Sequence, residues 1–335
     1  MIKETWKELR ARGVLGLNDR NLHYVSKYNE RRLYPLVDDK YRTKKLARAA
    51  GVAVPELYGM VEILRQARDL PAVVQDKAGF AIKPSQGSGG SGVLVLTERT
   101  KNGWRKSSGD ILTWEDLQYH ISLILSGIFS LGGQPDKALV EYRVVPDKVF
   151  NQISYLGVPD MRIIVFFGVP VMTMVRLPTR ISGGRANLHQ GAIGVGIDIA
   201  TGQTQTGVCQ NEIITEHPDT GYSIMGIEIP HWEEMLALAA KSYELTGLAY
   251  QGVDIVLDRT HGPLLLELNA RPGLNIQIAN NCGLLPRLKK VEWNRKKLRT
   301  PEDRVKFAKD EFGVQSTLNE AWRRYKRSTF FGRVK

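Results

Sequence analysis

Residues 263–275, PLLLELNARPGLN, decide the fold of this chain of 335 residues. Three leucines form an apolar run, and Glu267 and Asn269 follow one residue apart. Alternate residues of a strand share a face, so both oxygen-bearing side chains are expected to point the same way. Carboxylate and amide oxygens are ligands that Mg²⁺ accepts, with phosphate and water in its other positions. The pattern indicates a metal site on a strand, although polar residues also occur at ordinary strand ends.

A second carboxylate lies in the preceding apolar segment. Residues 252–257, GVDIVL, place Asp254 inside a run that is typical of a buried strand. Two adjacent strands would bring Asp254, Glu267 and Asn269 to one point. These three residues are candidate metal ligands, and an edge strand that enters a polar turn is the alternative.

Composition indicates an ordinary globular chain. With 42% hydrophobic residues, it can bury a sizeable core divided among two or more subdomains. No apolar run is long enough to span a bilayer, and residues 1–9 carry charges instead of an apolar signal region, so we expect a cytoplasmic protein without membrane insertion. Cys209 and Cys282 are isolated from each other and from histidines at ligand spacing, which argues against a disulfide framework or a zinc site.

Positive charge is concentrated near the end of the sequence. The formal net charge is +12, and residues 287–335 hold 16 Lys and Arg against 6 Asp and Glu, an excess of 10. Such a segment is a solvated surface or a dock for an acidic partner, nucleic acid included. Composition alone leaves these alternatives open.

A glycine-rich loop follows the strand expected at residues 80–83. Lys83 ends that strand, residues 85–92 read SQGSGGSG, and an apolar strand at 93–96 follows. P-loops and dinucleotide-binding loops lead into a helix, so this loop is instead predicted to be the tip of a hairpin. Its free backbone N–H groups are suited to cover a polyphosphate, and Lys83 adds a charge at its base. A plain hairpin turn is the alternative.

The remaining pattern alternates helices and strands. A strand at residues 138–142 ends its apolar run in Glu141, which is suited to hold a ribose hydroxyl, with the following backbone at the adenine edge, or is simply a strand terminus. Helices are expected at 39–50, 61–67, 110–131, 230–247 and 274–281, and a hairpin at 161–177.

Polar residues of that hairpin and of the loop after it are candidates for phosphate contacts. Arg176 lies near the end of the hairpin, and the glycine-rich connection 181–196 holds Arg185, Asn187 and His189. An arginine and an asparagine on such a loop are suited to hold a transferring phosphoryl group. A lone loop histidine is more typical of structural hydrogen bonding than of general-base catalysis.

Taken in order, these motifs resemble those of the ATP-grasp superfamily from about residue 38 to 281. The series includes Asp39-Lys40, Asp160-x-Arg162 and Glu267-x-Asn269-x-x-Pro272-Gly273. Residues 185–191, RANLHQG, resemble especially the α-L-glutamate ligase-like proteins, which are related to ligases that add glutamate to a ribosomal protein.

The resemblance implies an α+β fold of the ATP-grasp type, in which two α+β subdomains clasp ATP. It implies a helical N-terminal extension at 1–37 in place of a full preceding domain. An N-terminal lid subdomain at 38–139, a subdomain with the metal site at 140–285 and a basic helical tail at 286–335 would follow.

Roles follow from the same resemblance. Arg185, Asn187 and Arg176 would meet phosphate and substrate as catalytic residues, and Asp254, Glu267 and Asn269 would bind two Mg²⁺ ions, with Mn²⁺ as a substitute. ATP would contact Lys40, Lys83, Ser88, Gly89, Gly90, Glu141 and Asp160.

We therefore predict an ATP- and Mg²⁺-dependent carboxylate–amine ligase. It would form an amide through an acylphosphate, joining an amino-acid or peptide carboxylate to an amine acceptor, with glutamate suggested by the family name. The alternative is a non-catalytic, ATP-gated binding protein that docks through its basic tail on an acidic protein, with nucleic acid a less favoured partner. Kinase-like transfer to a small molecule is a weaker third possibility. The ordered set of oxygen ligands favours the enzyme, because a binder driven by charge has no use for it.

Overall fold

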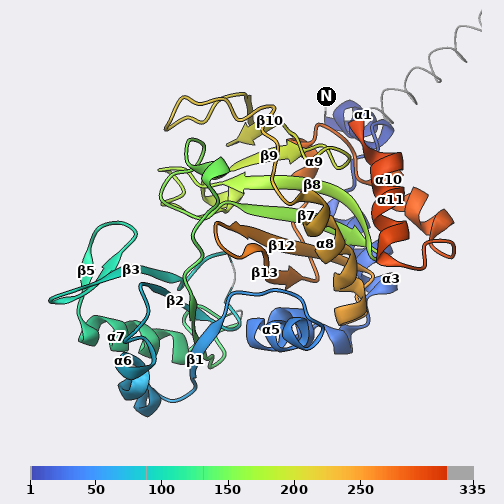
Figure 1. Ribbon diagram of the computed structural model, residues 1–335. Coiled ribbons are helices and arrows are strands. Elements are labelled where there is room, and N and C mark those ends of the chain that lie inside the picture. The colour runs from blue at the N-terminus through green and yellow to red at the C-terminus, as the bar shows by residue number, and fades with distance from the viewer. Residues whose placement is uncertain (1, 88, 131, 315–335) are drawn as a thin grey trace, which may run out of the picture.

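The computed structural model describes residues 2–87, 89–130 and 132–314, and in residues 2–6 only the backbone. Two lobes are visible in Figure 1, and each is built around one antiparallel sheet. The expected α+β class and the short N-terminal helices are confirmed. Ser88 and the last part of the basic segment, 315–335, lie outside the described residues.

The small lobe contains a six-stranded sheet in the order β1-β6-β2-β3-β4-β5. The glycine-rich loop joins β2 to β3, and Phe80 and Ile82 pair with Leu96 and Leu94, so the predicted hairpin is confirmed. Apolar residues of α7 close one side of this sheet. The strands are β1 (Leu57–Val61), β2 (Phe80–Pro84), β3 (Leu94–Thr100), β4 (Gly103–Lys106), β5 (Ile111–Leu112) and β6 (Ala138–Tyr142).

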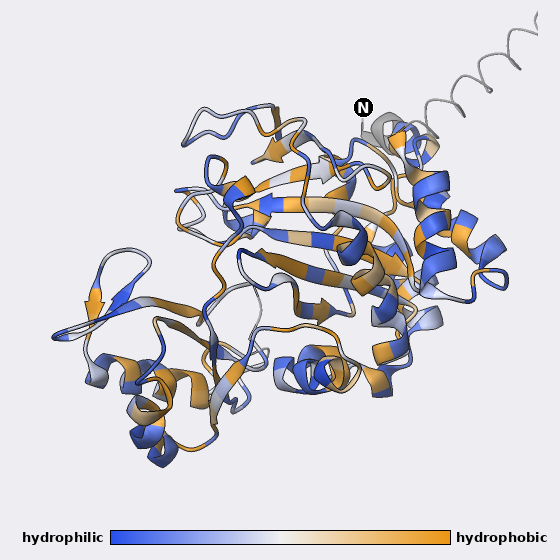
Figure 2. Ribbon diagram, viewed as in Figure 1, coloured by the Kyte–Doolittle hydropathy of each residue, from blue (hydrophilic) through white to orange (hydrophobic). Residues whose placement is uncertain are grey.

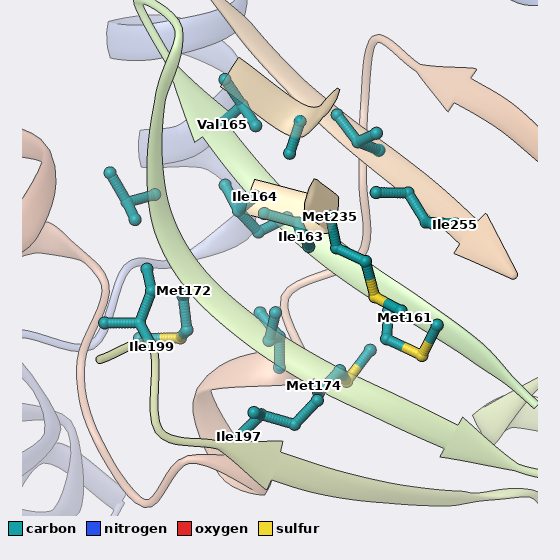
Figure 3. Packing of buried hydrophobic residues seen from close by; sticks show 14 of the residues in the cluster. Met161, Ile163, Ile164, Val165, Met172, Met174, Ile197, Ile199, Met235 and Ile255 are labelled. Atoms are coloured by element: carbon teal, nitrogen blue, oxygen red, sulfur yellow. The ribbon is translucent and has the colours of Figure 1, made fainter. Parts of the chain in front are cut away.

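The large lobe contains a seven-stranded sheet in the order β11-β10-β9-β8-β7-β12-β13. Helix α8 packs on one face, where Figure 3 shows Met235 directed at Met161 of β7. The strands are β7 (Asp160–Phe166), β8 (Val169–Leu177), β9 (Ile193–Ile197), β10 (Thr204–Cys209), β11 (Glu212–Ile214), β12 (Tyr250–Asp258) and β13 (Gly262–Asn269).

The opposite face of the large sheet is divided between packing and polar chemistry. At one end of β7 and β12, Phe166 and Tyr250 pack against Tyr24 of the N-terminal helices, with the Tyr24 and Phe166 ring centroids 5.5 Å apart. At the other end of these two strands, the side chains on the same face are those of Asp160, Arg162 and Asp254. Because side chains alternate along a strand, one face of the sheet therefore carries both a core and a charged end.

Helices surround the two sheets. Asp39 caps the N-terminus of α5, and the Thr113/Asp116 and Thr300/Asp303 capping boxes start α7 and α11. The α-helices are α1 (Ile2–Ala11), α2 (Leu17–Arg20), α3 (Ser26–Tyr28), α4 (Pro35–Asp38), α5 (Lys40–Ala49), α6 (Leu70–Val73), α7 (Trp114–Leu125), α8 (Trp232–Thr246), α9 (Ile276–Ala279), α10 (Leu285–Asn294) and α11 (Pro301–Phe312). A π-helical turn (Asn21–Val25) and short 3₁₀ segments (Arg31–Leu33, Leu64–Asp69, Lys148–Phe150, Leu188–Gln190) complete the described structure.

The described part of the basic segment is folded. Leu288 of α10 and Phe312 of α11 belong to the core of the large lobe, and the ribbons of both helices are largely hydrophilic elsewhere (Figure 2). Several of its cations are paired: Lys290 with Glu311, Lys309 with Glu233 and Arg304 with Glu244. The predicted boundaries at residues 38, 140 and 286 stay predictions.

Three expected helices differ from the structure. The helix expected at 61–67 is wrong. Residues 57–61 form β1, which pairs with β6, and a 3₁₀ segment, Leu64–Asp69, follows after it. Helix α7 ends at Leu125, shortly before Gly127 adopts a φ of +82°. Helix α9 is one short turn, Ile276–Ala279, rather than a helix over 274–281. None of the helices in the described ranges has both the length and the apolarity that a membrane span requires.

Candidate functional site

A row of charged side chains crosses four strands of the large sheet. Asp160 on β7 lies opposite Arg176 on β8, and Arg162 on β7 lies opposite Asp254 on β12. Asp254 in turn lies opposite Glu267 on β13. Residues directly opposite in an antiparallel pair share a face, so the sheet register alone gathers these five side chains. The predicted convergence of Asp254 and Glu267 on adjacent strands is confirmed.

Two arginines hold the buried carboxylates of this row. Arg176 donates from Nε and Nη2 to Asp160, at 2.5 and 2.6 Å, and from Nη2 to Asp254 at 2.8 Å. Arg162 donates from Nη2 to Asp254 at 2.7 Å and from Nε to its other oxygen. Burial would raise the pKa of Asp254, but the two guanidinium groups together lower it. Burial raises the pKa of Asp160 to about 6, against the opposing effect of Arg176.

Glu267 and Asn269 lie at the more open end of the row. Both are partly exposed, whereas Asp254 is only 2% exposed. Lys40 Nζ lies 3.3 Å from Glu267 Oε2, and Asn269 Oδ1 accepts a hydrogen bond from the backbone N–H of Arg271 at 2.8 Å.

The donors at this end of the row are suited to Mg²⁺. Glu267 and Asn269 are oxygen donors on one strand face, which suits a cation whose other ligands are phosphate and water. Asp254 is adjacent, but both its oxygens accept hydrogen bonds from guanidinium groups. Across the described ranges, no three His, Cys, Asp or Glu side chains gather as a metal site. Glu267 and Asn269 supply two oxygen donors, which suits a cation whose remaining ligands are not protein side chains.

Lys40 connects this end of the row to the glycine hairpin, which is formed by β2, the glycine-rich loop at 85–92 and β3. Asp39 accepts hydrogen bonds from the backbone N–H groups of Tyr41 and Arg42, which fixes the first turn of α5. The Ser85 hydroxyl donates to Asp39 at 2.6 Å, and the Lys40 N–H donates to the Ser85 carbonyl at 2.9 Å. Lys40 Nζ also donates to the carbonyl of Gly87. One side chain thus contacts both the hairpin and Glu267.

A second cluster lies at the base of the hairpin. Glu141 on β6 forms ion pairs with Lys83 on β2 and with Lys44 on α5, the latter at 2.8 Å. All three side chains are nearly fully buried. Burial lowers the pKa of Lys44 to about 8, although Glu141 partly offsets the effect. Burial would raise the pKa of Glu141, but Lys83 and Lys44 lower it. The ribose role expected for Glu141 stays a prediction.

The hairpin tip meets the loop that carries Arg185 and Asn187. Asn187 Nδ2 donates to the carbonyl of Gly89 at 3.3 Å, and a Cβ on Gly89 would lie 3.0 Å from that nitrogen. Gly90 lies beside the side chain of Arg185. Gly191 ends this loop at φ +99°, where a Cβ would lie 2.5 Å from Ile181, so a side chain would obstruct the loop's return. The structure thus brings the two predicted glycines and the two predicted loop residues together.

Three charged residues of the site were not among the predicted site residues. Lys44 pairs with Glu141, and Arg162 pairs with Asp254. Arg20 is buried and donates to the carbonyl of Pro272 at 2.6 Å, which holds the turn after Asn269. Lys44 follows Lys40 by one helical turn and Arg162 follows Asp160 on the same strand face, so those two had a signal in the sequence. The contact of Arg20 spans most of the chain and had none.

A family of known proteins matches most of this chain. The model of the family described as sugar-transfer associated ATP-grasp matches residues 19–293. No curated protein matches the sequence.

Several solved structures are similar to this chain at low identity. The ATP-grasp ligase PsnB, complexed with a minimal precursor, is 16% identical with a TM-score of 0.43, over 80% of this chain and 63% of that one. The D-cycloserine synthetase DcsG is 16% identical with a TM-score of 0.42, over 80% and 72%. D-alanine–D-alanine ligase from Bacillus anthracis, complexed with ATP, is 12% identical with a TM-score of 0.44, over 80% and 68%. This chain spans less than two thirds of the length of PsnB.

Proposed function

The chain belongs to the sugar-transfer associated ATP-grasp family, and on that premise we propose that it is an ATP-dependent ligase that joins a carboxylate to an amine. Membership confirms the superfamily and the ATP-grasp ligase fold expected from the sequence, while the likeness to α-L-glutamate ligase-like proteins stays a resemblance. In the proposed reaction, a carboxylate oxygen attacks the γ-phosphorus of ATP and ADP leaves. The amine nitrogen then attacks the acyl carbon, phosphate leaves, and the nitrogen loses a proton.

The position of Lys40 is the observation that carries this proposal. Its ammonium group contacts the Gly87 carbonyl in the glycine hairpin and lies 3.3 Å from Glu267. A polyphosphate between the hairpin and Glu267 would therefore meet a cation already in place. Preorganised charges of this kind stabilise the negative charge that phosphoryl transfer moves between oxygens.

The loop residues supply the second side of the proposed reaction centre. Arg185 is exposed, and across the described ranges it makes no ion pair, whereas Arg176 is engaged by Asp160 and Asp254. We assign Arg185 and Asn187 to the transferring phosphoryl group and the substrate carboxylate. Arg176 would act chiefly by holding the carboxylates of the row in position.

Glu267 and Asn269, with Asp254 beside them, would hold Mg²⁺ when the nucleotide is bound. The metal would then neutralise charge on phosphate oxygens. Two ions, and Mn²⁺ as a substitute, are part of the proposal. Lys83 and Glu141 at the hairpin base, Gly89, Gly90 and Ser88 in its tip, and Asp160 would contact ATP.

The substrates are proposed by class. An amino-acid or peptide carboxylate and an amine acceptor, with glutamate as one candidate, agree with the precursor peptide in a PsnB complex and the name of D-alanine–D-alanine ligase. The alternative of a binder that docks through its basic tail gains no support from the described residues, because Lys290, Lys309 and Arg304 pair within the chain.

The nucleotide product tests this function. Purified protein is incubated with Mg²⁺, ATP and panels of carboxylic acids and amines, and products are separated by chromatography and mass spectrometry. We expect ADP, phosphate and an amide that require both substrates. Release of AMP and pyrophosphate would rule out acylphosphate chemistry, and a phosphorylated product stable to added amine would indicate a kinase.

A further inference from the structure

A cavity of about 420 Å³ lies beside the Asn187 loop and outside the row of charges. Three segments line it: the loop at 181–192, the turn at 208–211 between β10 and β11, and the start of α9. No residue assigned above to ATP or Mg²⁺ is part of its lining.

The cavity is adjacent along the chain to both halves of the proposed reaction centre. Leu188, which lines it, directly follows Asn187. Asn275, which also lines it, follows the turn that begins at Asn269 and that Arg20 holds at Pro272. A substrate whose carboxylate lies at Arg185 and Asn187 can therefore extend into this cavity.

Its lining is uncharged, in contrast to the neighbouring site. Among the described residues that line it, none is Asp, Glu, Lys or Arg. The polar side chains are His189 and the carboxamides of Gln190, Gln210, Asn211 and Asn275, and the aliphatic ones are Ile181, Leu188, Val208 and Ile278. A charge placed here would lose hydration without gaining an opposite charge, which is unfavourable.

Carboxamides favour partners that both donate and accept hydrogen bonds. Each has an acceptor oxygen and two donor hydrogens, which match hydroxyl and amide groups. Within the described structure, the side-chain oxygen of Gln190 is buried and accepts no hydrogen bond, so it can still accept one from a ligand. The aliphatic residues complement the carbon skeleton of the same ligand.

We propose that this cavity binds an uncharged, hydroxyl- or amide-bearing extension of the carboxylate substrate. The inference rests on the proposed ligase function and specifies its substrate class: one reacting carboxylate and a neutral polar body. It disfavours, in this position, an acid with a second charged group at its far end.

Matched pairs of acids test the proposal by NMR. The full-length protein, labelled at isoleucine methyl groups, is held with Mg²⁺ and a non-hydrolysable ATP analogue. It is titrated with gluconate or its dicarboxylate glucarate, and with N-acetyl-L-glutamine or N-acetyl-L-glutamate. We expect saturable shifts of the Ile181 and Ile278 signals at concentrations at least tenfold lower for the neutral-ended member of a pair. Comparing the two pairs distinguishes hydroxyl from amide recognition.

Two tryptophan variants provide the control. Ile278→Trp fills the cavity and is expected to abolish the shift of Ile181. Ile213→Trp, at an exposed position on β11 outside the cavity lining, should leave it unchanged. Absence of shifts with both gluconate and N-acetyl-L-glutamine would overturn the proposal. So would equal shifts with glucarate and N-acetyl-L-glutamate, or an Ile181 shift that persists in Ile278→Trp.

The same spectra separate this inference from the proposed function. Ile82 on β2 precedes Lys83, so its methyl signal reports binding of the ATP analogue. If Ile82 responds but the cavity reporters do not, the cavity assignment fails and the ATP site stands. If Ile82 does not respond and calorimetry detects no binding of the ATP analogue, the nucleotide site itself is wrong.

Discussion

Asp254 and Glu267 lie directly opposite each other on β12 and β13, but their carboxylates have different surroundings. Asp254 is buried and accepts hydrogen bonds from Arg162 and Arg176, whereas Glu267 is partly exposed and has Lys40 at 3.3 Å. The first carboxylate is held by the sheet, and the second is open to a ligand. Substitutions at the two positions should therefore have different consequences.

Glu267→Ala should abolish ligand-dependent turnover without unfolding the protein. Loss of the metal ligand is expected to lower turnover by about 100-fold or more, while the free energy of unfolding changes by less than about 1 kcal/mol. ADP release and the Mg²⁺ dependence of nucleotide affinity by calorimetry measure the effect. Glu212→Ala, on exposed β11, is the control. Wild-type Mg²⁺ dependence in Glu267→Ala would remove this residue from the metal site.

Asp254→Asn should destabilise the fold. The change leaves the buried guanidinium group of Arg162 and the partly buried one of Arg176 without their shared anion, which is expected to cost about 3–5 kcal/mol. Urea unfolding followed by circular dichroism measures it. A loss below about 1 kcal/mol would show that the arginines find other partners and that Asp254 is not their structural anchor.

Arg185 and Arg176 should separate chemistry from stability. Arg185→Met removes an exposed cation, so turnover should fall by about 100-fold while stability stays within about 0.5 kcal/mol. Arg176→Met should instead lower stability, because the buried carboxylates of Asp160 and Asp254 lose a cationic partner. Comparing ADP release with urea unfolding for both variants checks the distinction. Equal losses of stability would contradict it.

Nucleotide affinity should decrease as the pH rises through about 8. Below that pH, Lys44 is protonated, and the cluster of Lys44, Lys83 and Glu141 carries a net positive charge. Burial lowers the pKa of Lys44 to about 8, so at higher pH this charge is lost and an anion binds less well. Calorimetry with ADP from pH 7 to 9 measures the slope. Lys44→Met should flatten it, and Lys45→Met, at the exposed neighbouring position, should not.

Gly89→Val should weaken ATP binding by about tenfold. Gly89 has a φ of +64°, and a side chain there would press on Asn187, so the hairpin tip would have to move. Gly109→Val is the matched control, since Gly109 also has a positive φ but a Cβ at that position would have no neighbour within 4 Å. If both variants bind ATP equally well, contact between the hairpin and the Asn187 loop is unimportant for binding.

The local sequence determined several parts of this protein. Strand periodicity placed Glu267 and Asn269 on one face, and the apolar runs around the SQGSGGSG loop identified a hairpin instead of a phosphate loop before a helix. Both are properties of a few consecutive residues, so they can be predicted without knowledge of distant parts of the chain.

Tertiary structure decided which charges neutralise each other. Residues 57–61 form a strand by pairing with β6, which lies far away in the chain. The partners of Glu141, the two arginines on Asp254 and the hold of Arg20 on Pro272 join segments far apart in the chain. Sequence alone showed which residues carry charge or oxygen. The packing of two sheets determined which of them are buried in pairs and which face a ligand. The reason is that pairing depends on distance in space and on exclusion of water.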